Sequence, residues 1–296
     1  MRSLSFGEIL WDIIDGKAYI GGAPFNLAAH LAKLGVSSYI VSAVGGDELG
    51  RAALERADEL GVATAFLTRI PTLPTGTVDV LLSPEGQPTY TIHENTAWDA
   101  IALDGDDLAA IRASEWDAFC FGTLAQRSER NRSTLSELVH ASRAKNVVYD
   151  VNLRQRYYEK SWIEQSLEWA TILKLNAEEA EVIAAMLFGK VLDTDEFCDR
   201  VGRSFEIPIV CVTQGAEGAA VWSRGSTAWV PGVSVEVQDT VGAGDSFTAA
   251  FLAALDGGKS VAEAAKLACR VGAWVASCRS AVPDYSDEIR ELFSRP

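Results

Sequence analysis

The chain has 296 residues, of which 48% are hydrophobic and 23% are charged, and its formal net charge is −15. This length and composition indicate one large globular domain with an appendage. A surface this acidic repels phosphate backbones and anionic lipids, which argues against nucleic-acid and membrane partners and requires any phosphate site to be built locally, from backbone amides, a metal ion or a few cations.

The cysteines and the N-terminus indicate a reducing compartment. The five cysteines are scattered and include no C-x-x-C pair, which argues against a disulfide framework and a zinc site. The first residues, M-R-S-L-S-F-G-E-I-L-W-D, carry acids where a signal peptide is apolar, and no stretch is long enough to span a bilayer. We therefore expect a cytoplasmic protein.

Short β-rich runs alternate with longer helical runs along the chain. This alternation predicts an α/β fold with a mostly parallel sheet covered on both faces. The expected strands are Leu4–Leu10, Ser38–Val44, Ala118–Phe121, Val147–Val151, Thr171–Leu175, Ile209–Thr213 and Ala219–Ser223. The expected helices are Pro24–Leu34, Glu48–Leu60, Arg130–Ala144, Ala177–Leu187 and a long stretch from Ala243 to Cys278.

Two segments break this alternation. Asp12–Tyr19 is short and extended, and Thr75–His93 has the pattern of a hairpin with its turn at Ser83–Pro88. Neither contains a helix, so the two can form a small antiparallel sheet that projects from the main domain. A lid over a crevice and a plain edge extension both fit this pattern.

The segment D-T-V-G-A-G-D (residues 239–245) separates an extended run from a long apolar helix. Gly242 and Gly244 lack side chains, so backbone N–H groups can converge at the helix N-terminus, where they bind anions. The carboxylate of Asp245 beside such a pocket suits a base that takes a proton from a hydroxyl attacking a bound phosphoryl group. A glycine-rich turn with Asp245 as a helix-capping acid is the alternative.

Two further motifs carry groups suited to sugar hydroxyls. In G-G-A-P-F-N (residues 21–26) the glycines allow close backbone approach, Pro24 suits the first turn of a helix, and Asn26 can both donate and accept. Asp12 follows the first predicted strand, at the edge of the sheet where ligands bind in α/β folds. A plain turn and a solvated loop acid are the alternatives.

Three more strand ends carry groups suited to phosphates. Asn176 and Glu179 match a capping box, and their oxygens also suit Mg²⁺ and its waters. Arg154 is a cation available to an anionic group, or a partner in a surface ion pair. Thr213 and Gly215 can lie beside nucleotide phosphates or form a tight turn. Because these motifs fall where strands end, they can meet along one rim of the sheet.

Together the motifs resemble those of the ribokinase-like (PfkB) carbohydrate kinase family, from about Ser5 to the C-terminus. D-T-V-G-A-G-D-S-F resembles the C-terminal signature of the family. G-G-A-P-F-N-L-A-A-H-L-A-K-L-G, followed by V-G-G-D-E-L-G-R, resembles its N-terminal signature, and D-V-N-L-R and N-A-E-E fall between them. The resemblance implies a doubly wound α/β domain with a small β lid and ATP-dependent phosphorylation of a sugar.

The resemblance also implies roles for individual residues. The implied roles are the base at Asp245, an anion hole at Gly242, Ala243 and Gly244, sugar contacts at Asp12, Gly22 and Asn26, action through Mg²⁺ and water at Asn176 and Glu179, proximity to ATP at Thr213 and Gly215, and a K⁺ loop at Asp239 and the Val241 carbonyl. We expect a main domain of residues 1–11, 23–70 and 98–296, a lid of residues 12–22 and 71–97, and a homodimer formed through exposed lid strands.

The predicted substrate is fructose or a related ketose. Ribokinase-type members carry an asparagine and a lysine where this chain has Leu10 and Ala23, and G-E-I-L-x-D with G-G-A-P-x-N is similar to fructokinases instead. The lid segment Y-T-I-H-E-N-T-A-W-D departs from the pattern common in fructokinases and puts His93 where a substrate contact is expected. The alternatives are ribose, a nucleoside, a sugar phosphate, 2-keto-3-deoxygluconate with Arg154 facing its carboxylate, or a non-catalytic sugar or nucleotide sensor.

Overall fold

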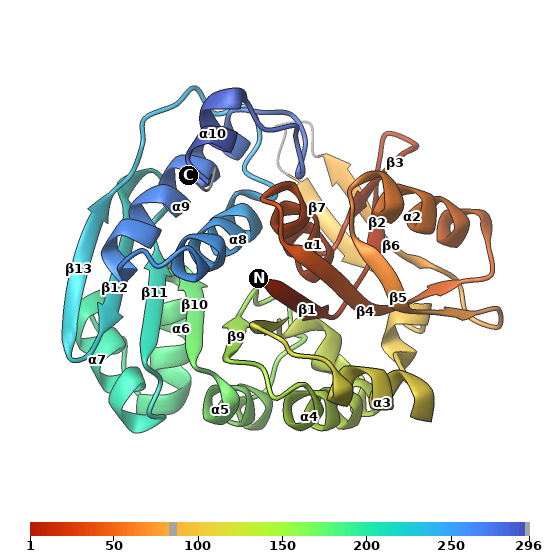
Figure 1. The fold of residues 1–296 in the computed structure, drawn as a ribbon, viewed down its shortest axis with the longest axis horizontal. Coiled ribbons are helices and arrows are strands. Elements are labelled where there is room, and N and C mark those ends of the chain that lie inside the picture. The colour runs from red at the N-terminus through yellow and green to blue at the C-terminus, as the bar shows by residue number, and fades with distance from the viewer. Residues whose placement is uncertain (83–87, 294–296) are drawn as a thin grey trace.

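The computed structural model describes residues 1–82 and 88–293 (Figure 1). Among these residues, nine strands form a large sheet and four form a second, smaller sheet. The turn predicted at Ser83–Pro88 lies outside the described residues except for Pro88, which begins a strand of the smaller sheet.

The large sheet is parallel over most of its width. Its strands, in spatial order, are β13 (Ser226–Pro231), β12 (Gly218–Ser223), β11 (Ile209–Thr213), β10 (Ile172–Asn176), β9 (Asn146–Asp150), β8 (Ala118–Phe121), β1 (Arg2–Phe6), β4 (Ser37–Gly45) and β5 (Ala63–Ile70). Neighbours from β11 to β5 pair in parallel, and β12 and β13 continue the sheet in antiparallel pairs. The predicted mostly parallel sheet is confirmed.

Helices cover both faces of this sheet (Figure 1). One face carries α1 (Ala23–Lys33), α2 (Glu48–Glu59), α8 (Ala243–Asp256), α9 (Val261–Ala276) and the short α10 (Asp287–Glu291). The other carries α3 (Gly105–Ala113), α4 (Glu129–Ser142), α5 (Lys160–Trp169), α6 (Ala177–Phe188) and α7 (Thr194–Ser204). Short 3₁₀ helices are η1 (Ala97–Ala100), η2 (Leu124–Arg127) and η3 (Gly215–Glu217).

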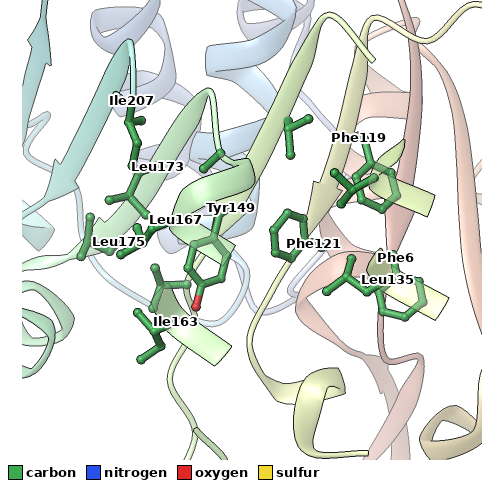
Figure 2. Close-up of a cluster of buried hydrophobic side chains, with 14 of the residues drawn as sticks. Phe6, Phe119, Phe121, Leu135, Tyr149, Ile163, Leu167, Leu173, Leu175 and Ile207 are labelled. Atoms are coloured by element: carbon green, nitrogen blue, oxygen red, sulfur yellow. The ribbon is translucent and has the colours of Figure 1, made fainter. Parts of the chain in front are cut away.

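The core lies between the sheet and these two helical layers. Figure 2 shows Phe121, Tyr149 and Leu173, from three neighbouring strands, packed with residues of α4 and α5. Alternate residues of the same strands, such as Val148, point to the opposite layer, under α8 and α9. Strands buried on both faces are apolar at consecutive positions, which is why their sequences are nearly continuous hydrophobic runs.

The smaller sheet has the order β3-β2-β6-β7. Its strands are β3 (Lys17–Gly21), β2 (Leu10–Ile14), β6 (Gly76–Leu82) and β7 (Pro88–Ile92). The outer pairs are antiparallel, but β2 and β6 pair in parallel, so the prediction of a purely antiparallel sheet is wrong. The reason is that β2 continues from β1 and β6 continues from β5, and both leave the parallel sheet in the same direction.

Two predicted elements are divided in the structure. The strand predicted at Leu4–Leu10 ends at Phe6, because Gly7 has a φ of 146° and turns the chain toward β2. The helical stretch predicted at Ala243–Cys278 is interrupted where Gly258 has a φ of 79°, and it forms α8 and α9. The elements β5, β13, α3, α5, α7 and α10 have no counterpart among the predictions.

The strand order changes direction between β1 and β8. From β1 the chain continues to β4 and β5 on one side, and β8 to β11 extend the sheet on the other side. A crevice outside the carboxyl ends of the strands forms at such a switch point and is where ligands bind in α/β sheets. The site described below lies at these strand ends.

All five cysteines are free, and Cys120, Cys198, Cys211 and Cys269 are buried. Within the described ranges, no helix has both the length and the apolar character needed to cross a membrane.

Candidate active site

The turn that precedes α8 requires glycine at its centre. Gly242 has a φ of 82°, and a Cβ at this position would lie 2.2 Å from the carbonyl oxygen of Ala281. Among the described residues, the N–H groups of Gly244 and Asp245 donate to no carbonyl outside the helix. These amides belong to the first turn of α8, where backbone donors have no intrahelical partner. They are therefore available to an anion, whereas the Ala243 N–H, which was predicted to belong to the anion hole, donates to the Thr240 carbonyl oxygen at 3.2 Å.

Asp245 lies in this first turn and is buried, with 7% of its surface exposed. Its Oδ2 accepts a hydrogen bond of 2.9 Å from Nδ2 of Asn26 on α1, which packs beside α8 (Figure 1). Burial and the nearby charge of Asp150 raise the pKa of Asp245 to about 6, although Lys174 and Arg154 act in the opposite direction. The carboxyl group thus titrates close to neutrality, as a general base requires.

A buried ion pair lies behind this turn. Nζ of Lys174 on β10 is 3.0 Å from Oδ1 of Asp150, and both side chains are 6% exposed. The other carboxylate oxygen of Asp150 accepts a hydrogen bond of 2.7 Å from Thr248 on α8. A Cβ placed on Gly244 would be 3.0 Å from the Lys174 ammonium. The ammonium group therefore lies against the candidate anion turn.

Lys174 is a site residue that the sequence analysis missed. Burial lowers the pKa of Lys174, but the charges of Asp150, Glu179 and Asp245 outweigh it and raise this pKa, so the side chain stays cationic. The available signal was a lysine inside the apolar run T-I-L-K-L, because a charge in a buried strand is retained only when it is paired. It supplies a local cation in an acidic protein.

The hydroxyl-binding candidates gather where β2 and β3 meet α1. A Cβ on Gly21 would lie 2.6 Å from Oδ2 of Asp12, and one on Gly22, whose φ is 106°, would lie 2.4 Å from the carbonyl oxygen of Glu8. Both glycines are therefore needed for the close approach of these groups. Burial raises the pKa of Asp12 to about 6, and the charge of Arg154 lowers it in part.

Glu8 is a second residue that the sequence analysis missed. It is 4% exposed, and its Oε2 has no hydrogen-bond partner among the described residues. Burial raises the pKa of Glu8 to about 7, although its own backbone N–H and the charge of Arg154 lower it. The carboxyl group borders a small pocket of about 10 Å³, room for about one water. The other polar residues lining it include Thr123, Asp150 and Asn152.

The predicted capping box is present at the start of α6. The side chain of Asn176 accepts from the Glu179 N–H at 2.8 Å, and Glu179 accepts from the Asn176 N–H at 2.9 Å. The second oxygen of Glu179 accepts from the Leu153 N–H at 2.8 Å. Thr213 is the ladder partner of Asn176, and open space surrounds the α-carbon of Gly215. These residues share the strand-end rim, and their nucleotide roles remain predictions.

Arg154 and His93 differ in their relation to this site. The charge of Arg154 lowers the pKa values of Glu8, Asp12 and Asp245, and its exposed side chain donates to the Leu153 carbonyl oxygen at 3.1 Å. Nε2 of His93 is 2.9 Å from Oδ2 of Asp79. Asp79 pairs with the residue after Asp12 on β2, so it lies on the opposite face of the smaller sheet. The structure does not bring His93 to Asp12, and its substrate contact remains a prediction.

The predicted monovalent-cation loop has a local hydrogen bond of its own. Oδ1 of Asp239 accepts from the Val241 N–H at 3.0 Å, and the K⁺ site at this loop remains a prediction. Within the part of the chain that the structure describes, no group of three or more His, Cys, Asp or Glu side chains is placed to hold a metal ion directly.

The buried Glu8 carboxyl group predicts a pH-dependent gain in stability for Glu8→Gln. The folded pKa of about 7 lies above the model value of 4.5, so its contribution to stability is complete below pH 4.5 and is lost as the pH rises to 7. The neutral variant avoids this loss. The difference in free energy of unfolding between Glu8→Gln and wild type should therefore shift by about 2 kcal/mol in favour of the variant from pH 5 to pH 8. Denaturant titrations at both pH values measure this gain, and the exposed Glu55→Gln is the control. Parallel curves for Glu8→Gln and wild type would contradict it.

A family model described as pfkB family carbohydrate kinase matches residues 4–288. The chain is 31% identical to a fructokinase of Escherichia coli over 242 residues, 79% of this chain and 76% of that protein. A fructokinase of Vibrio cholerae, solved with fructose, ADP and calcium ion bound, has a TM-score of 0.83 at 24% identity and covers 99% of this chain and 98% of its own. A fructokinase of Xylella fastidiosa with bound ATP has a TM-score of 0.81 at 24% identity, with coverages of 95% and 94%. The chain therefore belongs to the pfkB family of carbohydrate kinases, as its motifs predicted.

Proposed function

We propose that this carbohydrate kinase transfers the γ-phosphoryl group of ATP to a hydroxyl of a neutral ketose, fructose or a close relative. The observation that carries the proposal is the buried carboxylate of Asp245, hydrogen-bonded to Asn26 beside the Gly242 turn. A carboxylate next to unpaired amides suits proton abstraction from a hydroxyl that attacks a bound phosphoryl group.

In the proposed reaction, Asp245 accepts the proton of the sugar hydroxyl. The sugar oxygen forms a bond to the γ-phosphorus while the bond from that phosphorus to the bridging oxygen breaks, and ADP leaves. The N–H groups of Gly244 and Asp245 and the ammonium of Lys174 stabilise the negative charge on the transferred group. The direct support for these roles is the position of all three groups at one turn.

The sugar side of the proposed site is acidic. Asp12, Gly22 and Asn26 are proposed to hold hydroxyl groups, with Arg154 over them. A second phosphate or a carboxylate on the substrate asks for unpaired cations around the pocket. The charge of Arg154 already favours the ionised forms of Glu8, Asp12 and Asp245, because it lowers their pKa values. A neutral sugar fits this balance better than a sugar phosphate or a sugar acid.

The other cations near the base of the smaller sheet have acidic partners. Nε of Arg127 lies 2.7 Å from Oδ1 of Asp99, and Nη2 of Arg156 lies 3.6 Å from Oε1 of Glu94. The buried Arg127 is therefore not free to neutralise an anionic substituent on the substrate, whereas the exposed pair of Arg156 is weak. This pairing also favours a neutral sugar.

The nucleotide is proposed to lie along the ends of β10 and β11, near Thr213 and Gly215. ATP carries Mg²⁺ into kinases, where the ion neutralises phosphate charge. Each oxygen of Glu179 already accepts one backbone N–H, so Asn176 and Glu179 fit contact through the waters of Mg²⁺. A K⁺ ion at Asp239 and the Val241 carbonyl is proposed on the sequence resemblance alone.

A panel of acceptors tests the substrate. In an ADP-release assay, kcat/KM for fructose or another neutral ketose should exceed that for fructose 6-phosphate by at least about tenfold, because the pocket would leave a second phosphate unpaired. Ribose, a nucleoside and 2-keto-3-deoxygluconate complete the panel, and a reaction without sugar is the control. Preference for an anionic sugar would overturn the proposed substrate. Sugar binding by calorimetry with no ADP formed from any acceptor would indicate a sensor instead.

Replacing the proposed base tests the mechanism. Asp245→Asn keeps the shape of the side chain and removes its basicity, so kcat on the best sugar should fall roughly 10²–10⁴-fold. Asp58→Asn, an exposed change on α2, should leave kcat unchanged. Equal turnover by Asp245→Asn and wild type would show that another group takes the proton.

The pH profile is an independent check of the same assignment. The base works in its ionised form, and burial raises the pKa of Asp245 to about 6. At saturating ATP, kcat/KM for the sugar should therefore fall about tenfold per pH unit below pH 6. Asp245→Asn should lose this acid limb, and a limb that persists in the variant would assign it to a different group.

We also propose that residues 12–22 and 71–97 act as a lid and that two lids pair in a homodimer. Tyr19, Leu81 and Tyr90 are 51%, 67% and 48% exposed on this sheet. Exposed apolar side chains and open strand edges favour association. Sedimentation velocity should give the mass of two chains for wild type and of one chain for Leu81→Arg. A wild-type monomer at micromolar concentration would disprove the dimer.

A further inference from the structure

The segment after β9 carries Arg154 between two residues of left-handed conformation. Asn152 has a φ of 48° and Gln155 a φ of 49°, which is uncommon for residues other than glycine. We refer to residues 152–158 as the arginine loop. Such a backbone persists only when its surroundings hold it in place. The contacts that hold the arginine loop come largely from the lid.

Two side chains of the arginine loop bind the lid strand β7 and the residues that follow it. Nε2 of Gln155 donates to the carbonyl oxygen of Tyr90 at 2.8 Å, and the hydroxyl of Tyr157 donates to Oε1 of Glu94 at 2.8 Å. The ring of Tyr157 also packs against the apolar cluster under the lid, which includes Ile92. The arginine loop is thus hydrogen-bonded both to β7 itself, at Tyr90, and to the chain just after it, at Glu94.

Arg127 on η2 contacts both the arginine loop and the chain that follows β7. Its guanidinium lies 4.0 Å from the ring centroid of Trp98 and 4.8 Å from that of Tyr157. It donates to both oxygens of Asp99 at 2.7 and 2.8 Å and to the carbonyl oxygen of His93 at 2.6 Å. One buried cation therefore contacts the end of β7, η1 and the arginine loop.

These contacts differ in expected strength. The Arg156–Glu94 pair is 3.6 Å long, with side chains 84% and 51% exposed, and solvent screens such a pair almost completely. The side chain of Arg127 is 7% exposed, and its stacking and hydrogen bonds are shielded from water. The connection between lid and arginine loop thus depends on Arg127, Tyr157 and Gln155, not on the surface ion pair.

We propose that Gln155, Tyr157 and Arg127 are positioning residues that couple the lid to Arg154. None of the three is assigned a contact with the sugar. They fix the arginine loop, and with it the backbone of Arg154, relative to β7 of the lid. The inference rests on the proposed role of Arg154 in sugar binding.

The test is a double-mutant cycle on sugar binding. The combined variant Gln155→Ala and Tyr157→Phe removes both hydrogen bonds and leaves the Tyr157 ring on Arg127. KM for the best sugar should rise about tenfold, roughly threefold per hydrogen bond, while KM for ATP and the melting temperature stay near wild type. Arg156→Ala is the matched control on the same loop and should change KM less than about twofold.

Arg154→Ala supplies the second background of the cycle. When Arg154 is absent, the loop variant should add less than about a twofold further increase in KM, because its effect passes through that side chain. The same tenfold increase in both backgrounds would overturn the coupling. An equal rise in KM for ATP would also overturn it, because that would indicate general loosening of the site.

Hydrogen exchange separates failure of this inference from failure of the proposed function. It is measured on the full chain without sugar or ATP, so its result does not depend on turnover. The amides of residues 88–93 and of the arginine loop should both exchange faster in the loop variant than in wild type. Unchanged protection of β7 would overturn the coupling even if the chain proved to be an active fructokinase. Faster exchange with no activity on any sugar would support the coupling and reject the substrate.

Discussion

The hydrogen bond from Asn26 to Asp245 fixes the separation between the two halves of the proposed site. α1 begins at Gly22, where the hydroxyl-binding candidates gather, and α8 begins at Gly242, where the free amides lie. The two helices pack side by side, and their first turns are in contact (Figure 1). The hydrogen bond between Asn26 and Asp245 holds these first turns together. It therefore helps to set the distance between a sugar oxygen bound near α1 and a phosphoryl group bound near α8. Reactions of this kind depend mainly on that distance.

Charge is balanced locally in a protein whose surface is strongly acidic. The raised pKa values of Glu8, Asp12 and Asp245 share one main cause, which is burial. Buried carboxyl groups cost stability when they ionise, and folds retain such groups where their chemistry is needed. The charge of Lys174, which lies within the sheet, offsets part of this cost at Asp245. The site thus needs few surface cations.

The sequence was informative wherever local pattern decides the structure. The strand at Ala118–Phe121 and the helix that follows Asn176 were predicted closely, because continuous apolar runs and a capping box are local signals. The strand-end motifs also predicted that Asn26 and Asp245 belong to one site, since parallel strands bring their carboxyl ends to one edge.

Predictions failed where the outcome depends on burial or on pairing between distant segments. Glu8 was missed because its importance comes from burial, and Lys174 was missed although its place in an apolar run indicates a buried, paired charge. The parallel pairing of β2 with β6 and the side-chain direction of His93 follow from strand register, which residues far apart in sequence determine. Gly7 was predicted inside a strand although its φ of 146° ends it.

The contact between Asn26 and Asp245 joins residues 219 positions apart. Synthesis proceeds from the N-terminus, and domains fold as their segments emerge. A growing chain therefore contains its proposed hydroxyl-binding groups long before the carboxylate and the amides of α8 exist. An unfinished polypeptide that ends before residue 245 therefore lacks the proposed base and cannot carry out the proposed transfer.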